Sequence, residues 1–215
     1  MTSLEMVHIV DDDPAIRSAL TASLEARGYS VKDYESSEIF LNMYRDDQIG
    51  CLVLDIKMPG IDGLELQKIL NEKKYTIPII FVTGHGDVPM SVQALKNGAL
   101  DFLEKPYRQE TLQERIELAL AQSKVIREKV AKINSCYERY NCLSPREKQI
   151  MAMLIADYAN ISNKKIAEAL DISPRTVEDH RAKIMLKMNA KSLSELVTMT
   201  NFCGYSPHVD QENSE

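Results

Sequence analysis

The run GCLVLD at residues 50–55 constrains the fold more than any other part of this 215-residue chain. It is almost entirely apolar and ends in the carboxylate of Asp55. A strand that is apolar at consecutive positions is expected to be covered on both faces, as strands of parallel sheets are. The next residues, KMPG at 57–60, can hardly extend a strand. Asp55 is therefore expected at the end of a buried strand, as a capping acid, a metal ligand, a general base or a group that is itself modified.

Four other short runs in the first 107 residues have the composition of strands, and helical patterns separate them. The runs are MVHIV at 6–10, SVKDY at 30–34, IPIIFVT at 77–83 and ALDFLEK at 99–105. Strands that alternate with amphipathic helices indicate parallel βαβ units. The predicted fold of this part is an α/β doubly wound five-stranded parallel sheet.

Polar side chains stand at the carboxyl ends of four of these strands. Asp11 and Asp12 follow the first, Asp55 ends the third, Thr83 ends the fourth and Lys105 ends the fifth. Such ends face one crevice in a doubly wound sheet, and two or three carboxylates there suit Mg²⁺. Each residue has an ordinary alternative role, as a solvated turn acid, a strand threonine or a surface lysine. Their shared position at one edge of the sheet favours a common site.

A long helix is predicted after the last strand, because residues 107–140 contain no Gly or Pro. Apolar or small residues recur there with the spacing of a coiled-coil seam. The positions are Leu112, Ile116, Ala119, Ser123, Ile126, Val130, Ile133, Tyr137 and Tyr140. The first half fits a helix packed on the sheet, which gives a first domain of residues 1–124. Residues 125–141 are interpreted either as a solvated tail or as a linker that pairs with a second copy through Ile126, Val130 and Ile133.

Residues 142–201 have short helical segments and no strand-like run. SPRE at 144–147 and SLSE at 192–195 both fit the capping box that opens a helix. Ser173 and Pro174 open a further helix, which is predicted to reach Met188. Short helices of this kind suffice for a helix-turn-helix unit. The polar tail at 202–215 is expected to be disordered.

The two halves differ in charge. Residues 1–124 hold 13 basic and 20 acidic side chains, whereas residues 141–200 hold 9 basic and 7 acidic ones. This asymmetry indicates two domains with different partners. The basic excess of the second half is too small to identify nucleic acid as its partner by charge alone.

The composition and the first residues of the sequence predict neither a membrane-spanning protein nor a secreted one. No apolar run approaches the ~20 residues that span a bilayer, and the start has no basic segment followed by an apolar one. The four cysteines, at 51, 136, 142 and 203, form no CxxC pair and no cluster with histidine. They are predicted to be reduced thiols of a cytoplasmic protein that does not associate with membranes.

Three segments of the first half resemble the receiver domain of bacterial two-component response regulators, closest to the FixJ group. They are VDD at 10–12, LDIKMPGIDG at 54–63 and VTGHGDVPMSVQALKNGALDFLEKP at 82–106. The resemblance implies a CheY-like fold in which Asp55 accepts a phosphoryl group from a sensor histidine kinase. It also implies roles for other residues. Asp11, Asp12, Asp55 and the backbone carbonyl of Lys57 would hold Mg²⁺, Thr83 and Lys105 would contact the phosphoryl group, and Phe102 would be the rotating aromatic.

The second half is similar to the LuxR/FixJ-type helix-turn-helix effector domain. The similarity rests on LSPREKQIMAML and NKKIAEALDISPRTVEDHRAKIMLKM, and it makes residues 174–188 the recognition helix. The side chains then expected at DNA are Lys164, Lys165, Arg175, Thr176, Glu178, Asp179, His180, Arg181, Lys183 and Lys187. A plain solvated helix face is the alternative, and it is about equally good for Asp179.

The two resemblances together predict a phosphorylation-controlled transcriptional regulator, not an enzyme. Phosphorylation would change the surface around Val92, Leu95 and Lys96, and the resulting homodimer would bind promoter DNA and engage RNA polymerase. A phosphatase that forms an aspartyl-phosphate is a weaker alternative, since it needs an acid where Lys57 stands. A receiver-like module that is never phosphorylated is also weaker, because the whole acidic set is present.

Overall fold

The computed structural model describes residues 5–84, 88–158 and 161–204. The chain divides into two compact units, residues 1–128 and residues 129–215. Each unit has its own hydrophobic core and is described by itself.

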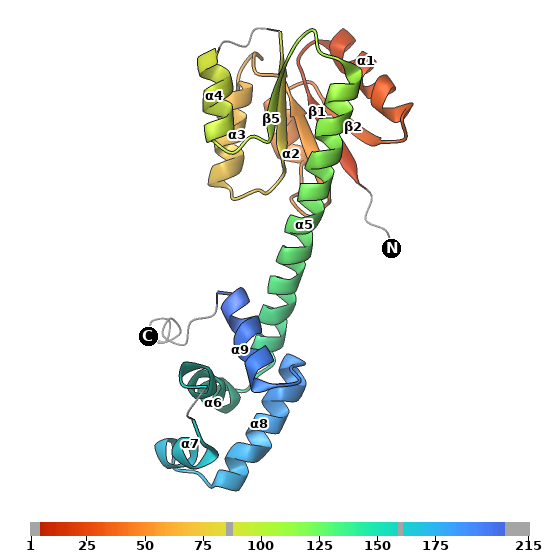
Figure 1. The fold of residues 1–215 in the computed structure, drawn as a ribbon. Helices are drawn as coiled ribbons and strands as arrows, with labels where there is room; N and C mark the ends of the chain where they lie inside the picture. Colours follow the sequence, from red (N-terminus) through yellow and green to blue (C-terminus); the bar gives the residue numbers. More distant parts are fainter. Residues whose placement is uncertain (1–4, 85–87, 159–160, 205–215) are drawn as a thin grey trace. The chain divides into compact units, whose positions relative to one another are not determined.

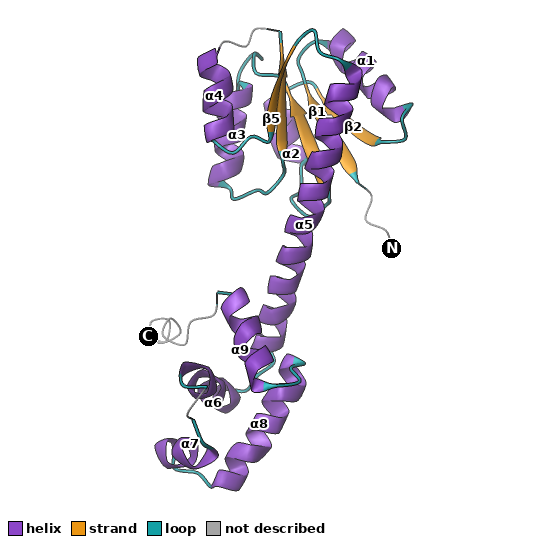
Figure 2. Ribbon diagram, viewed as in Figure 1, coloured by secondary structure: helices purple, strands orange, loops and turns teal. Residues whose placement is uncertain are grey.

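The N-terminal unit contains a five-stranded parallel sheet, which confirms the predicted α/β fold (Figure 2). The strands are β1 (Met6–Val10), β2 (Ser30–Tyr34), β3 (Gly50–Leu54), β4 (Ile79–Thr83) and β5 (Asp101–Glu104). Their order is β2-β1-β3-β4-β5, and all neighbours are parallel. The order reverses between β1 and β3, so the switch point lies between the ends that carry Asp11 and Asp55.

Helices cover both faces of this sheet, as the apolar β3 requires (Figure 1). One face packs on α2 (Ser37–Met43), α3 (Gly63–Glu72) and α4 (Val88–Lys96), and the other on α1 (Pro14–Glu25) and the first turns of α5 (Gln109–Asn141). Alternate residues of β3 serve the two layers. Leu52 and Leu54 belong to the first core, and Cys51 and Val53 to the second.

The turn after β3 is shaped by glycines. A Cβ on Gly63 would lie 2.3 Å from the backbone oxygen of Asp55, so no larger residue fits at the start of α3. Gly60 has φ of +75°, which other residues rarely adopt. The chain can therefore bend away directly after Asp55 and leave its carboxylate at the edge of the sheet.

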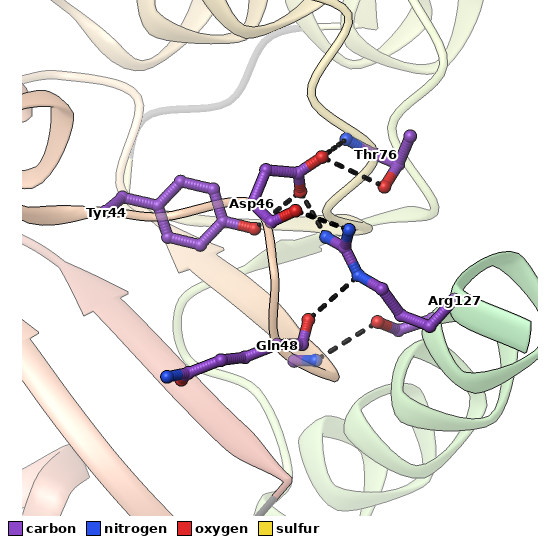
Figure 3. A network of polar contacts seen from close by, with 7 residues as sticks. Tyr44, Asp46, Gln48, Thr76 and Arg127 are labelled. Carbon is purple, nitrogen blue, oxygen red and sulfur yellow. Dashed lines mark hydrogen bonds and ion pairs between the residues drawn. The ribbon is translucent and has the colours of Figure 1, made fainter. Parts of the chain in front are cut away.

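Polar contacts hold α5 to the N-terminal unit as far as residue 127. The Ser123 hydroxyl accepts the Gly50 N–H at 3.1 Å. Arg127 donates to the backbone oxygen of Gln48 at 3.0 Å and to that of Asp46 at 2.5 Å, and its guanidinium pairs with the Asp46 carboxylate (Figure 3). The unit thus extends slightly past the predicted boundary at 124.

The Asp46 carboxylate is the centre of this network. Besides Arg127, it accepts the Tyr44 hydroxyl at 2.9 Å and both the N–H and the hydroxyl of Thr76 at 3.2 and 3.3 Å. Asp46 and Arg127 are only 16% and 14% exposed. One side chain therefore connects α2, the loop before β4 and α5.

The C-terminal unit is all helical, as predicted. It comprises α6 (Pro145–Ala156), α7 (Asn163–Leu170), α8 (Pro174–Met188) and α9 (Leu193–Phe202), together with the last turns of α5. Ser144 and Glu147 form the predicted capping box. Ser192 caps α9, but the Glu195 carboxylate accepts the Lys191 N–H instead of completing a box with Ser192.

The last turns of α5 belong to the C-terminal core, which the sequence pattern did not predict. Cys136 is buried there and Tyr140 packs against the same core, whereas Tyr137, a predicted seam position, is 45% exposed. Ile126, Val130 and Ile133 are half-buried. At the other end of the unit, α9 reaches Phe202, and the rest of the predicted tail from residue 205 lies outside the described residues.

Candidate functional site

The predicted acidic site assembles at the carboxyl edge of the sheet. Carboxylate oxygens of Asp11, Asp12 and Asp55 lie within 4.8 Å of one another. The Lys105 ammonium lies 3.1 Å from the Asp11 carboxylate, and Thr83 hydrogen-bonds to Asp55. Five side chains from the ends of four strands thus meet in one place.

Asp11 is fixed by its backbone and by its neighbours. Its N–H donates to the backbone oxygen of Tyr34 at 3.3 Å, and its own backbone carbonyl accepts a hydrogen bond from the Arg17 guanidinium at 2.8 Å. The Asp11 carboxylate accepts the N–H of Asp13, whose side chain caps α1. Asp11 is buried and Asp12 is exposed, so the pair lines the wall and the rim of the site.

The protein's own side chains compensate the Asp55 carboxylate only in part. Its Oδ1 is buried and has no hydrogen-bond partner. Burial raises the pKa of the Asp55 carboxyl and the Asp11 carboxylate raises it further, while Lys105 and hydrogen bonds from the Ile56 backbone and Thr83 oppose them. An orphaned carboxylate oxygen beside two further acids fits a hard divalent cation such as Mg²⁺. For Lys57 the structure shows an exposed side chain, and no contact assigns its carbonyl to the site.

Replacing Asp55 by Asn should stabilise the N-terminal unit at neutral pH. The raised pKa means that the folded state holds the proton of Asp55 more tightly than the unfolded state. The free energy of unfolding therefore falls as the pH rises from the ordinary pKa of an aspartate through the raised pKa of Asp55. The Asn variant should unfold at higher urea concentration at pH 7 but not at pH 3. Mg²⁺ should stabilise the wild type more than the variant, and an equal response would contradict the predicted metal site.

The surface predicted to dimerise is exposed within the N-terminal unit. Val92 and Leu95 of α4 are 42% and 46% exposed, and Lys96 is exposed beside them. Phe102 is half-buried on β5 and packs against the core on the α4 side of the sheet. Phe102 and α4 thus lie on the same side of the sheet.

The predicted DNA-binding residues lie on α7 and α8, and α8 has the predicted bounds 174–188. Arg175 lies 3.5 Å from the Glu178 carboxylate and 3.8 Å from that of Asp179. These surface pairs fit the solvated-face interpretation of the two acids. Arg181 bonds Asn163 of α7 at 2.5 Å and so links the two helices.

Lys187, a predicted phosphate contact, also makes contacts within the C-terminal unit. Its ammonium lies 2.7 Å from the buried Glu147 carboxylate and 3.1 Å from the backbone oxygen of Cys142. Glu147 also accepts the Ser144 N–H, and these bonds lower the pKa of its carboxyl, Lys187 contributing most. The sequence does not predict this pair, because its partners lie 40 positions apart and no local pattern connects them.

Comparison with known proteins identifies both units. Residues 7–117 match the model of the response regulator receiver domain, and residues 141–200 match that of bacterial regulatory proteins of the luxR family. The transcriptional regulatory protein FixJ of Bradyrhizobium diazoefficiens is 43% identical over 95% of this chain and 98% of its own. The chain belongs to the FixJ/NarL family of response regulators. It is a phosphorylation-controlled transcriptional regulator with a receiver domain and a DNA-binding domain, and not an enzyme.

Other proteins that this chain resembles are also response regulators. The response regulator protein TodT of Pseudomonas putida is 41% identical over 91% of the chain and 85% of its own. The solved structure of the response regulator StyR is 38% identical, with a TM-score of 0.82 over 93% of this chain and 99% of that one. Receiver domains generally bind Mg²⁺ at their acidic site, and the family implies a sensor kinase and DNA as partners. Within the described part of the chain, no helix is long and apolar enough to cross a membrane.

Proposed function

We propose that Asp55 is the phospho-acceptor of this response regulator and that a sensor histidine kinase is the donor. The observation that carries the proposal is the environment of the Asp55 carboxylate. This carboxylate lies in a cluster with Asp11, Asp12 and Lys105, and one of its oxygens is buried without a hydrogen-bond partner. An Asp55 oxygen attacks the phosphorus of the phosphohistidine, the P–N bond breaks, and the imidazole leaves and takes up a proton. The product is a mixed anhydride on Asp55.

The surrounding side chains have distinct roles in this transfer. The Lys105 ammonium stabilises the negative charge that the phosphoryl oxygens carry, and the Thr83 hydroxyl moves from Asp55 to the phosphoryl group. Asp11, Asp12, Asp55 and the carbonyl of Lys57 would hold Mg²⁺. When bound, Mg²⁺ offsets the repulsion between these carboxylates and the incoming phosphoryl group.

The change at Thr83 then reaches the α4 surface through Phe102. Thr83 and Phe102 lie on the neighbouring strands β4 and β5, and Phe102 packs on the α4 side of the sheet. Phosphate shifts the population toward the state in which it is better bound. In that state Val92, Leu95 and Lys96, with Ile126, Val130 and Ile133 of α5, form the homodimer contact.

The dimer binds promoter DNA in the cytoplasm through two copies of α8 and engages RNA polymerase. Of the predicted contacts, Lys164, Lys165, Arg175, His180 and Lys183 remain as phosphate or base contacts. Four further predicted contacts also lie on α8: Thr176, Glu178, Asp179 and Arg181. Glu178 and Asp179 pair with Arg175, and Arg181 bonds Asn163. Lys187 drops out of this set because Glu147 engages it.

DNA affinity tests this proposal, with two lysines of α8 as a matched pair. Lys183 is exposed, so Lys183→Ala should weaken DNA binding at every sequence and reduce the salt slope by about 1. Lys187→Ala should instead lower the stability of the C-terminal unit, since it leaves Glu147 buried without its partner. Fluorescence anisotropy at several salt concentrations and thermal unfolding measure the two effects. If Lys187→Ala changed the salt slope and Lys183→Ala did not, the assignment would be wrong.

A further inference from the structure

A cavity opens in the N-terminal unit, on the face of the sheet that α2 covers. It has a volume of about 190 Å³ and lies at the outer edge, where β2 pairs with β1. None of its lining residues belongs to the acidic site. Its walls combine apolar surface, from Met6, Met43, Tyr34 and Tyr44, with the imidazole of His8.

The charged groups that line this cavity are both cations. Lys32 and Arg45 contribute them, and the described lining residues include no carboxylate. The Lys32 ammonium lies 5.5 Å from the centre of the Tyr34 ring, and its charge helps to lower the pKa of His8. Two acids next to the lining residues are engaged elsewhere, because Asp33 pairs with Arg17 and Asp46 with Arg127.

The aromatic side chains at this cavity contact one another and carry no charge at neutral pH. His8 Nδ1 lies 3.0 Å from the Tyr34 hydroxyl, and the two rings stack with centroids 5.8 Å apart. The His8 ring also meets the ring of Tyr44 edge-on at 5.2 Å. Burial, helped by Lys32, lowers the pKa of His8 to about 4, so the imidazole is uncharged at neutral pH. None of the described residues that line the cavity therefore offers a negative charge to Lys32 and Arg45.

We propose that this cavity binds a small organic monocarboxylate with a flat apolar body. The carboxylate would pair with Lys32 and Arg45, and the body would lie mainly against Met6 and Met43, because Tyr34 and Tyr44 are each only 3% exposed. The volume is below the range of roughly 300–1,000 Å³ that drug-sized ligands occupy, which limits the body to about one ring. An inorganic phosphate would match the charge but leave the apolar walls without a partner.

A ligand at this position would touch the network that holds α5. The Tyr44 ring lines the cavity while its hydroxyl binds Asp46, and the Gln48 oxygen accepts Arg127. Figure 3 shows the Gln48 side chain pointing away from Arg127, and this side chain lines the cavity. The proposed ligand site is thus separate from Asp55, but it shares Tyr44 and Gln48 with the network of polar contacts around Asp46 and Arg127.

Benzoate is the probe for this site, with benzamide as its neutral counterpart. NMR titration of the full chain should give benzoate at least about tenfold tighter binding than benzamide, because only benzoate pairs with the two cations. Lys32→Gln and Arg45→Gln should each remove most of this difference, whereas Lys68→Gln, at an exposed lysine of α3, should leave it intact. Bound benzoate should also raise the pKa of His8.

Three results would overturn the proposal. They are the absence of benzoate binding at millimolar concentration, equal affinities for benzoate and benzamide, and benzoate binding that neither cavity variant weakens. Tighter binding of inorganic phosphate than of benzoate, lost in the same variants, would replace the organic ligand by a simple anion and would equally count against it.

Discussion

Asp46→Ala is expected to lower the free energy of unfolding of the receiver domain by about 3 kcal/mol or more. The substitution leaves the Arg127 guanidinium, which is only 14% exposed, without its ion pair. It also removes the acceptor of the Tyr44 hydroxyl and of both Thr76 donors. Three elements lose their common partner at once, which explains why the effect exceeds that of an ordinary surface ion pair.

Asp47→Ala is the matched control, since Asp47 is adjacent and exposed. Urea unfolding followed by far-UV circular dichroism measures both variants, and amide exchange in β3 and in α5 locates the change. The α5 amides near Arg127 should exchange faster in Asp46→Ala than in Asp47→Ala. Equal stabilities of the two variants would show that the network is not what holds this part of α5.

Lys105→Met is expected to slow phosphorylation of Asp55 about 10²-fold or more, measured with a small acyl-phosphate donor and Mg²⁺. Lys105 is the cation that the structure places at the acidic cluster, 3.1 Å from Asp11. Removing it takes away the group that offsets negative charge as the phosphoryl group is transferred. The substitution also leaves the buried Asp11 carboxylate without its ion-pair partner, so far-UV circular dichroism should first show that the variant is folded.

Lys57→Met is the control for this rate. Lys57 stands two residues after Asp55, is exposed, and is proposed to contribute only its backbone carbonyl. The initial rate of mass gain should therefore change little in this variant. A similar loss in both variants would indicate a general effect of positive charge on donor binding, and would remove the specific role proposed for Lys105.

The sequence predicted those parts of the structure that depend on local patterns. Alternating strands and helices, with a wholly apolar third strand, were enough to specify the sheet and to place Asp11, Asp55 and Lys105 at one edge. Caps such as Ser144 with Glu147 follow from short spacings. In each case the physical cause acts within a few residues, or follows from the rule that parallel strands share one functional edge.

Contacts between distant segments could not be predicted in the same way. The heptad pattern on α5 places Tyr137 on the apolar seam, but in the structure Cys136 is buried and Tyr137 is exposed. Arg127 and Asp46 lie 81 positions apart in the sequence, one in a helix and one in a loop, so no local pattern pairs them. Lys187 looked like one more basic residue of a DNA-binding helix until its buried partner was visible.

The most direct test of the central claim is the site of phosphorylation. The chain should be incubated with a small acyl-phosphate donor and Mg²⁺, and its intact mass and the mass of the peptide that carries Asp55 should be measured. One phosphoryl group is expected on that peptide in the wild type, and none on the chain in Asp55→Asn. A wild type that gains no mass, or an Asp55→Asn variant that gains as much as the wild type, would contradict the account.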